Sequence, residues 1–170
     1  YQGSVELAEL LLDRGADVNY HSKKEGYTAL MFAALGGRLA VLNLLLDRGA
    51  KVTAINSLGR NASQMAAFVG QHRSVAVINN FIGREQLEYY TRITGLEKQP
   101  RLSVRLLAPL HMFVRLVNIH PVRIALYLKS NRSLLDDAKS VGNVLQLFSE
   151  KLLRSSEPKE MLSLKMHYLY

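Results

Sequence analysis

Histidines are the residues of this sequence whose side chains could most readily do chemistry, because imidazole binds metals and transfers protons near neutral pH. There are five of them, His21, His72, His111, His120 and His167. No two stand four residues apart and no His-Glu-x-x-His motif occurs, so the spacing that puts two ligands on one helical turn is missing. The sequence also has no cysteine, which excludes thiolate ligands, disulfides and a thiol nucleophile. We therefore expect no metal site, no cofactor and ordinary surface or capping roles for the histidines.

Neighbouring carboxylates are the second candidate for chemistry. Asp136 and Asp137 follow two leucines, and acidic residues are favoured where a helix begins, so they predict a helix start rather than a catalytic pair. No phosphate-binding loop, dinucleotide fingerprint or Gly-x-Ser-x-Gly motif is present. The sequence thus predicts a protein that is not an enzyme.

Basic residues are concentrated in one stretch of the chain. The formal net charge is +8, with +2 in residues 1–81 and +6 in residues 82–170, and between positions 92 and 132 the only acid is Glu97. Such a stretch could bind nucleic acid or anionic lipid, although a solvated helical surface explains it as well. No aromatic RNA-binding strand or helix-turn-helix signature accompanies it, so nucleic acid is not the expected partner. The residues of this predicted basic patch are Arg92, Lys98, Arg101, Arg105, Arg115, Arg123, Lys129 and Arg132.

An internal repeat organises the first half. Residues 26–34 recur in outline at 59–67, an offset of 33, and the Leu-Leu-Leu-Asp-Arg-Gly-Ala run at 10–16 returns at 44–50, an offset of 34. A period of this length predicts stacked helical hairpins. Paired alanines, at 33–34 and 66–67, would let neighbouring helices approach closely. Gly15 and Gly49 stand where the helices need a left-handed cap. The spacing predicts buried stripes at Leu7, Leu10 and Leu11 and at Val41, Leu44 and Leu45.

These residues resemble the ankyrin repeat, which implies an all-α helical solenoid that binds other proteins. A partial repeat covers residues 1–19, a full one 26–53 and a degenerate one 57–81; the last keeps none of the family's Thr-Pro-Leu-His start. In this family the variable positions of each first helix line the concave face and the loops between repeats form finger tips. The resemblance therefore implies a partner-binding surface at Phe32, Leu35, Met65, Phe68 and Val69, with finger tips at Tyr20, His21, Lys23, Lys24, Glu25, Ile55 and Asn56. Alternatively, the chain's own helices after residue 84 cover the apolar stripe and make it core.

The second half has a different helical pattern. We expect a short helix at 84–90 with Leu87 and Tyr90 on one side, and a connector that completes the segment 82–102. Pro109, Pro121 and Pro158 each precede an apolar stretch, which predicts helices near 109–118, 121–130 and 158–170 in the helical region 103–170. Residues Val141 to Leu152 have the apolar spacing of an amphipathic helix. This region is expected to dock against the repeats as a packed helical extension.

Further strings extend the likeness over nearly the whole chain. They include Gln64-Met65-Ala66-Ala67-Phe68, Ile78-Asn79-Asn80-Phe81 and Pro109-Leu110-His111. Together they resemble the ankyrin repeat and MYND domain-containing family of the type associated with cilia. That resemblance implies an adaptor that helps signalling proteins reach the cilium. It also implies a zinc-binding MYND module, whose cysteines this sequence does not contain.

Length and composition agree with a globular chain. The 170 residues are 48% hydrophobic and 21% charged, which is enough apolar material for one domain or two small ones. One of the longest apolar runs, from Ala29 to Leu35, is far shorter than a membrane span, so we expect a soluble piece of a longer protein located in the cytoplasm or cilium.

Overall fold

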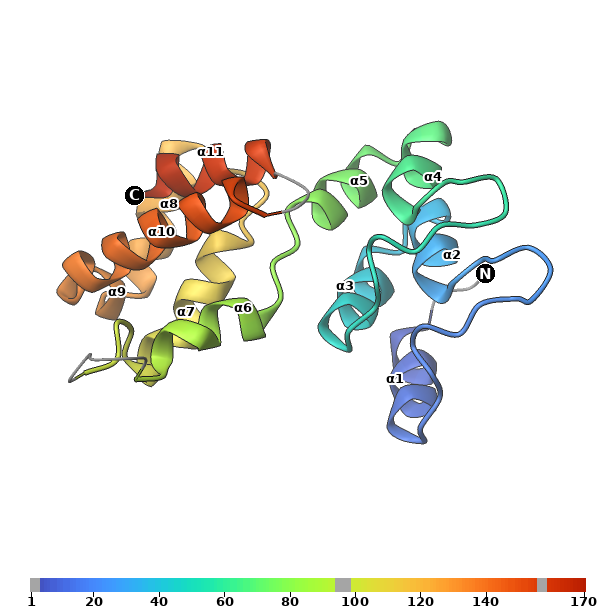
Figure 1. Cartoon of the computed structure of the whole chain (residues 1–170), viewed down its shortest axis with the longest axis horizontal. Coiled ribbons are helices and arrows are strands. Elements are labelled where there is room, and N and C mark those ends of the chain that lie inside the picture. Colours follow the sequence, from blue (N-terminus) through green and yellow to red (C-terminus); the bar gives the residue numbers. More distant parts are fainter. Residues whose placement is uncertain (1–3, 94–98, 156–158) are drawn as a thin grey trace. The chain divides into compact units, whose positions relative to one another are not determined.

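The computed structural model describes residues 4–93, 99–155 and 159–170, and the chain divides into two compact units between Gly83 and Arg84 (Figure 1). Apart from an isolated antiparallel bridge between His21 and Thr28, the described residues form helices, turns and loops. The all-α prediction is therefore confirmed.

The first unit consists of tandem helical hairpins. Its helices are α1 (Val5–Asp13), α2 (Ala29–Leu35), α3 (Leu39–Asp47), α4 (Ala62–Phe68) and α5 (His72–Asn79). The first helices of successive repeats, α2 and α4, pack side by side in one layer (Figure 1). The second helices form the other layer, in which α3 contacts both α1 and α5.

Side chains and glycines set the ends of these helices. Gly15 and Gly49 adopt φ values of 89° and 88°, which confirms the predicted left-handed positions. The Thr28 hydroxyl accepts the Met31 amide at 3.3 Å and so caps α2. The degenerate repeat has its own solution, a capping box in which Asn61 Oδ1 accepts the Gln64 amide and Gln64 Oε1 accepts the Asn61 amide. The lost Thr-Pro-Leu-His start therefore does not prevent a regular first helix.

Small and branched apolar residues form the core between the two layers. Ala33, Ala34 and Ala66 are buried in the core to which α2 and α4 contribute, as the close packing of these two helices requires, whereas Ala67 on α4 is exposed. The buried stripe of α3 is displaced by one position from the predicted Val41, Leu44 and Leu45. Its buried residues are Leu42, Leu45 and Leu46, because the run of leucines satisfies the helical spacing in two registers.

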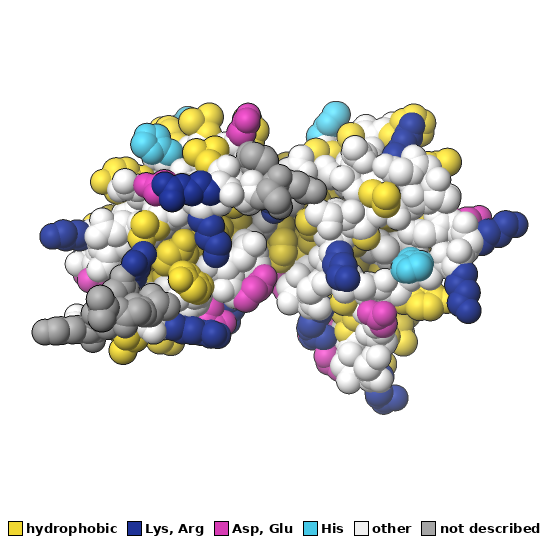
Figure 2. All heavy atoms as spheres, viewed as in Figure 1, with side chains coloured by type: hydrophobic (Ala, Val, Ile, Leu, Met, Phe, Trp, Pro, Cys, Tyr) yellow, Lys and Arg dark blue, Asp and Glu magenta, His cyan; other side chains and the backbone are white. Residues whose placement is uncertain are grey.

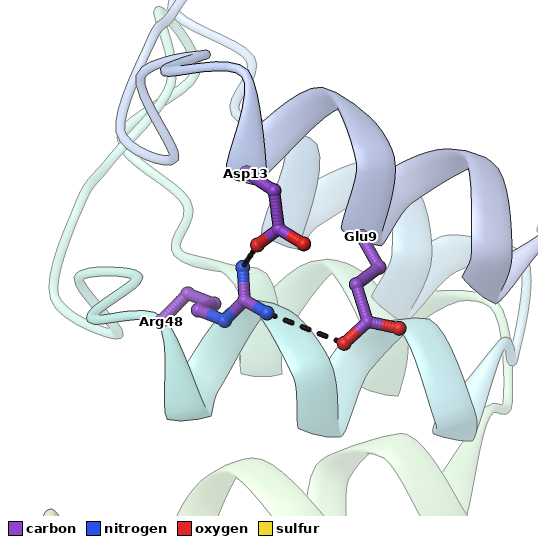
Figure 3. A network of polar contacts seen from close by, with 3 residues as sticks. All are labelled: Glu9, Asp13 and Arg48. Atoms are coloured by element: carbon purple, nitrogen blue, oxygen red, sulfur yellow. Dashed lines mark hydrogen bonds and ion pairs between the residues drawn. The ribbon is translucent and has the colours of Figure 1, made fainter.

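Helix α1 departs further from its prediction. Leu7, Leu10 and Leu11 are exposed, and α1 buries no residue, because it has α3 on one side and no described helix of its own repeat to cover its apolar face. Leu12 of α1 packs, partly buried, against the core, and polar contacts add to this attachment. Arg48, the C-cap residue of α3, donates to Asp13 Oδ1 at 2.7 Å and to Glu9 Oε1 at 3.3 Å (Figure 3). One guanidinium thus joins two carboxylates that lie one turn apart on α1.

The second unit contains α6 (Arg84–Glu88), the 3₁₀ turn η1 (Tyr89–Thr91), α7 (Val104–Val114), α8 (Pro121–Ser130), α9 (Ser133–Asp136), α10 (Ala138–Leu153) and α11 (Glu160–Leu169). Leu87 and Tyr90 are both buried, as predicted for the short helix after residue 84. The amphipathic helix is confirmed, because Val141, Val144, Leu145, Phe148 and Leu152 are all buried on α10. Phe148 meets the Tyr90 ring edge-on, with centroids 6.5 Å apart.

Prolines mark helix starts less reliably than the sequence argument assumed. Pro121 is the first residue of α8, as predicted. The predicted helix at 109–118 is wrong, because α7 begins five residues earlier and carries Pro109 in its interior. The buried spacing of Leu106, Leu110 and Phe113 continues through the proline and outweighs the lost hydrogen bond. The predicted start at Pro158 lies outside the described residues, and the described part of the last helix begins at Glu160.

Two adjacent acids have different positions. Asp136 is the last residue of the short helix α9, and Asp137 is the N-cap residue of the long helix α10. The predicted helix start is therefore at Asp137. Its Oδ2 accepts a hydrogen bond from Arg105 of α7 at 3.1 Å.

Polar side chains buried between helices complete the second unit. Ser149 and Ser163 exchange hydrogen bonds with each other's hydroxyl and carbonyl groups, which joins α10 to α11. Lys165 of α11 donates from Nζ to the carbonyl of Val114 at 2.6 Å, at the C-terminal end of α7. Among the helices of the described residues, none combines the length and the apolar character that a membrane span needs.

Candidate protein-interaction surface

Two loops between the repeats project as fingers. The first finger, residues 17–28, turns back on itself through the His21–Thr28 bridge and the hydrogen bond from the Gly26 amide to the Ser22 carbonyl. The second finger, residues 51–60, is shaped by Asn56. Its side-chain Oδ1 accepts the amides of Leu58 and Arg60, each at 3.0 Å. Both fingers are therefore fixed by local hydrogen bonds.

The two fingers are also tied to each other. At their base, Asn19 Nδ2 donates to the Gly49 carbonyl at 3.2 Å and Asn19 Oδ1 accepts the Lys51 amide at 2.8 Å. Further out, the Ser57 amide donates to the Glu25 carbonyl at 3.0 Å. Gly26 allows this approach, because a Cβ there would lie 3.2 Å from the Asn56 Cα, and its φ is +68°. These contacts fix the spacing of the fingers.

A pocket of about 760 Å³ lies along these two fingers. We call it the fingertip pocket; its walls include Asp17, Tyr20, His21, Ser22, Lys23, Lys24, Lys51, Ala54, Ile55 and Asn56. Tyr20 and Ile55 come from different fingers and are both exposed. The charged residues of the wall are three lysines and one carboxylate, and that carboxylate already accepts the Asn19 amide at 2.8 Å. The pocket is thus positively charged, with apolar side chains from both fingers.

A second surface is formed by the outward residues of the first helices α2 and α4. We call it the first-helix face and define it by Phe32, Leu35, Phe68 and Val69. Phe32 is 43% exposed and stacks on Tyr27 at 5.4 Å, while Phe68 is 73% exposed and has the Arg60 guanidinium 4.7 Å from its ring centre. Val69 is also exposed, and Leu35 is half-buried.

A groove of about 410 Å³ adjoins Phe32. The other residues that line it are Ala8, Ala29, Ala33, Gly36, Arg38, Val41 and Leu45, so its walls are apolar except at Arg38.

Most of the partner-binding residues proposed from the sequence lie on these two surfaces. Tyr20, His21, Lys23, Lys24 and Ile55 line the fingertip pocket, and Glu25 is exposed next to it. Two residues do not offer the surface expected of them. Met65 is 6% exposed and belongs to the core, because its side chain packs under the second finger, where Asn56 Nδ2 lies 3.5 Å from its sulfur. Asn56 itself is buried, because its side chain holds its own loop together.

Lys51 and Asn19 are functional candidates that the sequence argument missed. Lys51 adds the third ammonium group of the fingertip pocket, and Asn19 fixes the spacing of its walls. A signal was available in the repeat itself, because position 51 occupies the same register as Asp17 of the preceding repeat, which also lines the pocket.

The residues of the predicted basic patch come from several elements of the second unit. Arg92 pairs with Glu88 at 3.4 Å and Arg105 pairs with Asp137 at 3.1 Å, while Arg123, Lys129 and Arg132 belong to α8 and the start of α9. Arg101 precedes α7, Arg115 caps its end, and Lys98 lies outside the described residues. On the face drawn in Figure 2, the dark blue side chains are scattered among other types. The histidines are equally dispersed, and within the described part of the chain no group of His, Asp and Glu could hold a metal ion.

Comparison with known proteins agrees with this architecture. Residues 1–80 match the family model for ankyrin repeats, in three copies. The chain is 36% identical over 172 residues to dauer abnormal formation protein 25 of Caenorhabditis elegans, an alignment that covers 98% of this chain and 44% of that protein. It is 44% identical over 75 residues to human ankyrin repeat and KH domain-containing protein 1, which covers 43% of this chain and 3% of that one.

Human palmitoyltransferase ZDHHC17 is a third relative, 36% identical over 95 residues that cover 56% of this chain and 15% of the relative. The chain therefore spans less than half the length of each of these relatives. No solved structure matches it. The repeat period, the hairpin stack and the family match lead to one conclusion: residues 1–80 of this chain are a stack of ankyrin repeats.

Proposed function

We propose that this chain is a non-catalytic adaptor that binds other proteins through its ankyrin unit. The observation that carries the proposal is the exposure of Phe32, Phe68 and Val69 on the first-helix face. Exposed aromatic side chains on a repeat scaffold are typical of protein interfaces, because burying them against a partner removes apolar surface from water.

The two surfaces have different parts in this proposal. The first-helix face supplies apolar contact area, and the fingers, with polar residues such as His21, Lys23 and Glu25, select among partners. Polar groups at the rim of an interface contribute more to selectivity than to affinity, whereas a central aromatic side chain contributes most of the binding energy.

A finer proposal concerns the cellular role. The sequence resembles ankyrin repeat and MYND domain-containing proteins associated with cilia, and its alignment with dauer abnormal formation protein 25 extends beyond the repeats over nearly the whole chain. We infer that the protein acts in the cytoplasm or cilium and helps signalling proteins to reach the cilium. The proposed partners are accordingly proteins.

The double variant Phe32→Ala with Phe68→Ala tests the role of the first-helix face. We expect quantitative affinity capture from ciliated cells to lose a defined set of partners, while the thermal midpoint stays close to that of the wild type, because both rings are substantially exposed. The matched control is Met112→Ala with Met161→Ala, which removes exposed apolar side chains from the second unit. A collapse of the thermal midpoint would show that the two phenylalanines are core, and equal capture by both variants would contradict the proposal.

Salt titration separates this proposal from electrostatic binding through residues 92–132. A complex dominated by phosphate contacts weakens steeply as salt rises, while an apolar interface changes little.

A further inference from the structure

The fingertip pocket carries an inference about partner chemistry that goes beyond protein binding in general. We propose that it binds an acidic peptide segment of a partner protein, with an apolar side chain between Tyr20 and Ile55 and flanking carboxylates on the lysines. This rests on the proposed adaptor function and specifies the chemistry of one part of its surface.

Charge is the first argument. Lys23, Lys24 and Lys51 line the pocket together, and no carboxylate within the described residues forms an ion pair with any of them. Asp17 is the single acid of the wall, and its Oδ1 is engaged by the Asn19 amide. Glu25 is exposed beside the pocket and adds a second carboxylate, so the three ammonium groups still outnumber the carboxylates by one. A ligand that supplies carboxylates therefore complements the wall, and a basic ligand does not.

Apolar exposure is the second argument. Tyr20 is 68% exposed and Ile55 is 63% exposed, one on each finger, and Ala54 lines the wall as well. An acidic ligand without an apolar group would leave both side chains in water. A segment with one apolar residue between acids uses both features of the pocket.

Preorganisation is the third argument. Asn19 joins the bases of the fingers, and the hydrogen bond from Ser57 to Glu25 joins them further out, so the walls are held at a fixed spacing before a ligand arrives. A ligand that binds a preformed pocket does not have to order its loops, which lowers the entropic cost of association.

Size favours a peptide over a nucleic acid. A pocket of about 760 Å³ holds a few side chains, which is the range of bounded ligand sites. A nucleic acid strand would need a row of basic side chains along which its phosphate backbone could extend, together with several aromatic side chains on which its nucleobases could stack.

Fluorescence anisotropy with a labelled peptide that has a central leucine flanked by glutamates tests the proposal directly. We expect saturable binding by the whole chain, weaker binding when serine replaces the leucine, and no binding when lysines replace the glutamates. The double variant Lys23→Gln with Lys24→Gln should weaken binding of the acidic peptide by about tenfold, since two exposed ion pairs are lost.

A matched control and a charge reversal make the result specific. Lys139→Gln with Lys159→Gln removes the same charge from exposed positions of the second unit and should leave affinity within about twofold. The variant Lys23→Glu with Lys24→Glu should lose the glutamate peptide and gain the lysine peptide, an exchange that a misfolded finger cannot produce.

Four outcomes would overturn the proposal. Three concern the peptides: no binding of the acidic peptide, an equal loss of affinity in the control pair, or no gain of affinity for the lysine peptide after charge reversal. The fourth is tighter binding of a single-stranded oligonucleotide or of phosphatidylserine vesicles, with the same dependence on Lys23 and Lys24. If the peptide fails while the Phe32→Ala and Phe68→Ala variant still loses its partners, the adaptor function stands and only the pocket assignment falls.

Discussion

Lys165 shows how one buried charge sets a pH response. Its side chain is 7% exposed, and burial lowers its pKa from 10.5 to about 8. The hydrogen bond to the Val114 carbonyl satisfies one of the backbone carbonyl groups at the C-terminal end of α7. Both the ammonium form and the neutral amine form of Lys165 can donate this hydrogen bond. The lysine thus connects α11 to α7 without requiring a positive charge.

The free energy of unfolding should rise as the pH is raised from 8 to 10.5. Between the folded pKa of about 8 and the unfolded value of 10.5, the unfolded chain binds more protons, so stability increases with pH in this window. The gain is at most about 3 kcal/mol, and below pH 8 none of it is present. Urea titrations of the wild type and of Lys165→Met measure it as a difference, which removes the contribution of Tyr90 and Tyr127, whose pKa values are raised by burial.

In Lys165→Met the gain in stability between pH 8 and 10.5 that Lys165 contributes should be lost. Stability at neutral pH should not fall, because the cost of burying an ammonium is removed with its hydrogen bond. An unchanged slope in the variant would show that Lys165 is not the titrating group.

At the scale of the helix, α1 and α3 hold together in an unusual way. Repeats normally attach to each other by buried apolar stripes, but here Leu7, Leu10 and Leu11 are exposed, and Leu12 packs only partly buried against the core. Arg48 therefore has a larger share of the attachment than a surface arginine usually has (Figure 3).

Substitution of Arg48 by methionine should loosen α1 selectively. We expect faster amide hydrogen exchange in residues 5–13 and a loss of global stability below about 1 kcal/mol, because all three side chains of the network are partly exposed and screened by water. Arg73→Met, on the exposed side of α5, is the matched control and should leave α1 unchanged. If exchange in α1 is the same in both variants, the ion pairs do not hold this helix.

Helices and their buried faces could be predicted from the sequence where the apolar spacing allowed a single arrangement. The spacing from Val141 to Leu152 allows one buried face, and α10 has that face. In α3 the leucine run allows two registers, and sequence alone could not choose between them. Pro109 misplaced α7, because a proline permitted at a helix start also survives inside a helix whose other residues are well buried.

The candidate site could also be predicted in part: the position of its loops could, but the orientation of some of its side chains could not. Family positions located the fingers, but they did not reveal that Met65 and Asn56 face inward, since that depends on a hydrogen bond between side chains nine positions apart. Lys51 was missed because the family pattern singles out the finger tips, such as Ile55 and Asn56, whereas Lys51 is the first residue of the second finger.

On the scale of the whole molecule, each unit has a core of its own. Residues such as Leu30, Leu42 and Ala66 form the core of the ankyrin unit, and residues such as Leu106, Phe148 and Met166 are buried in the second. A unit with its own core can unfold locally without its neighbour, so we expect residues 1–83 and 84–170 to be separate cooperative units.

The variant Phe148→Ala tests this expectation. Loss of a fully buried phenylalanine that also contacts Tyr90 should cost the second unit about 3–5 kcal/mol. Hydrogen exchange should accelerate throughout the protected amides of α7, α10 and α11, while protection of α2 and α4 and affinity for the acidic peptide should remain at wild-type values. The matched variant Leu42→Ala, in the core of the ankyrin unit, should give the reverse pattern. If Phe148→Ala instead lowers protection in α2 and α4 as well, the helices after residue 84 stabilise the first-helix face, and the apolar stripe is covered by the chain itself rather than kept free for a partner.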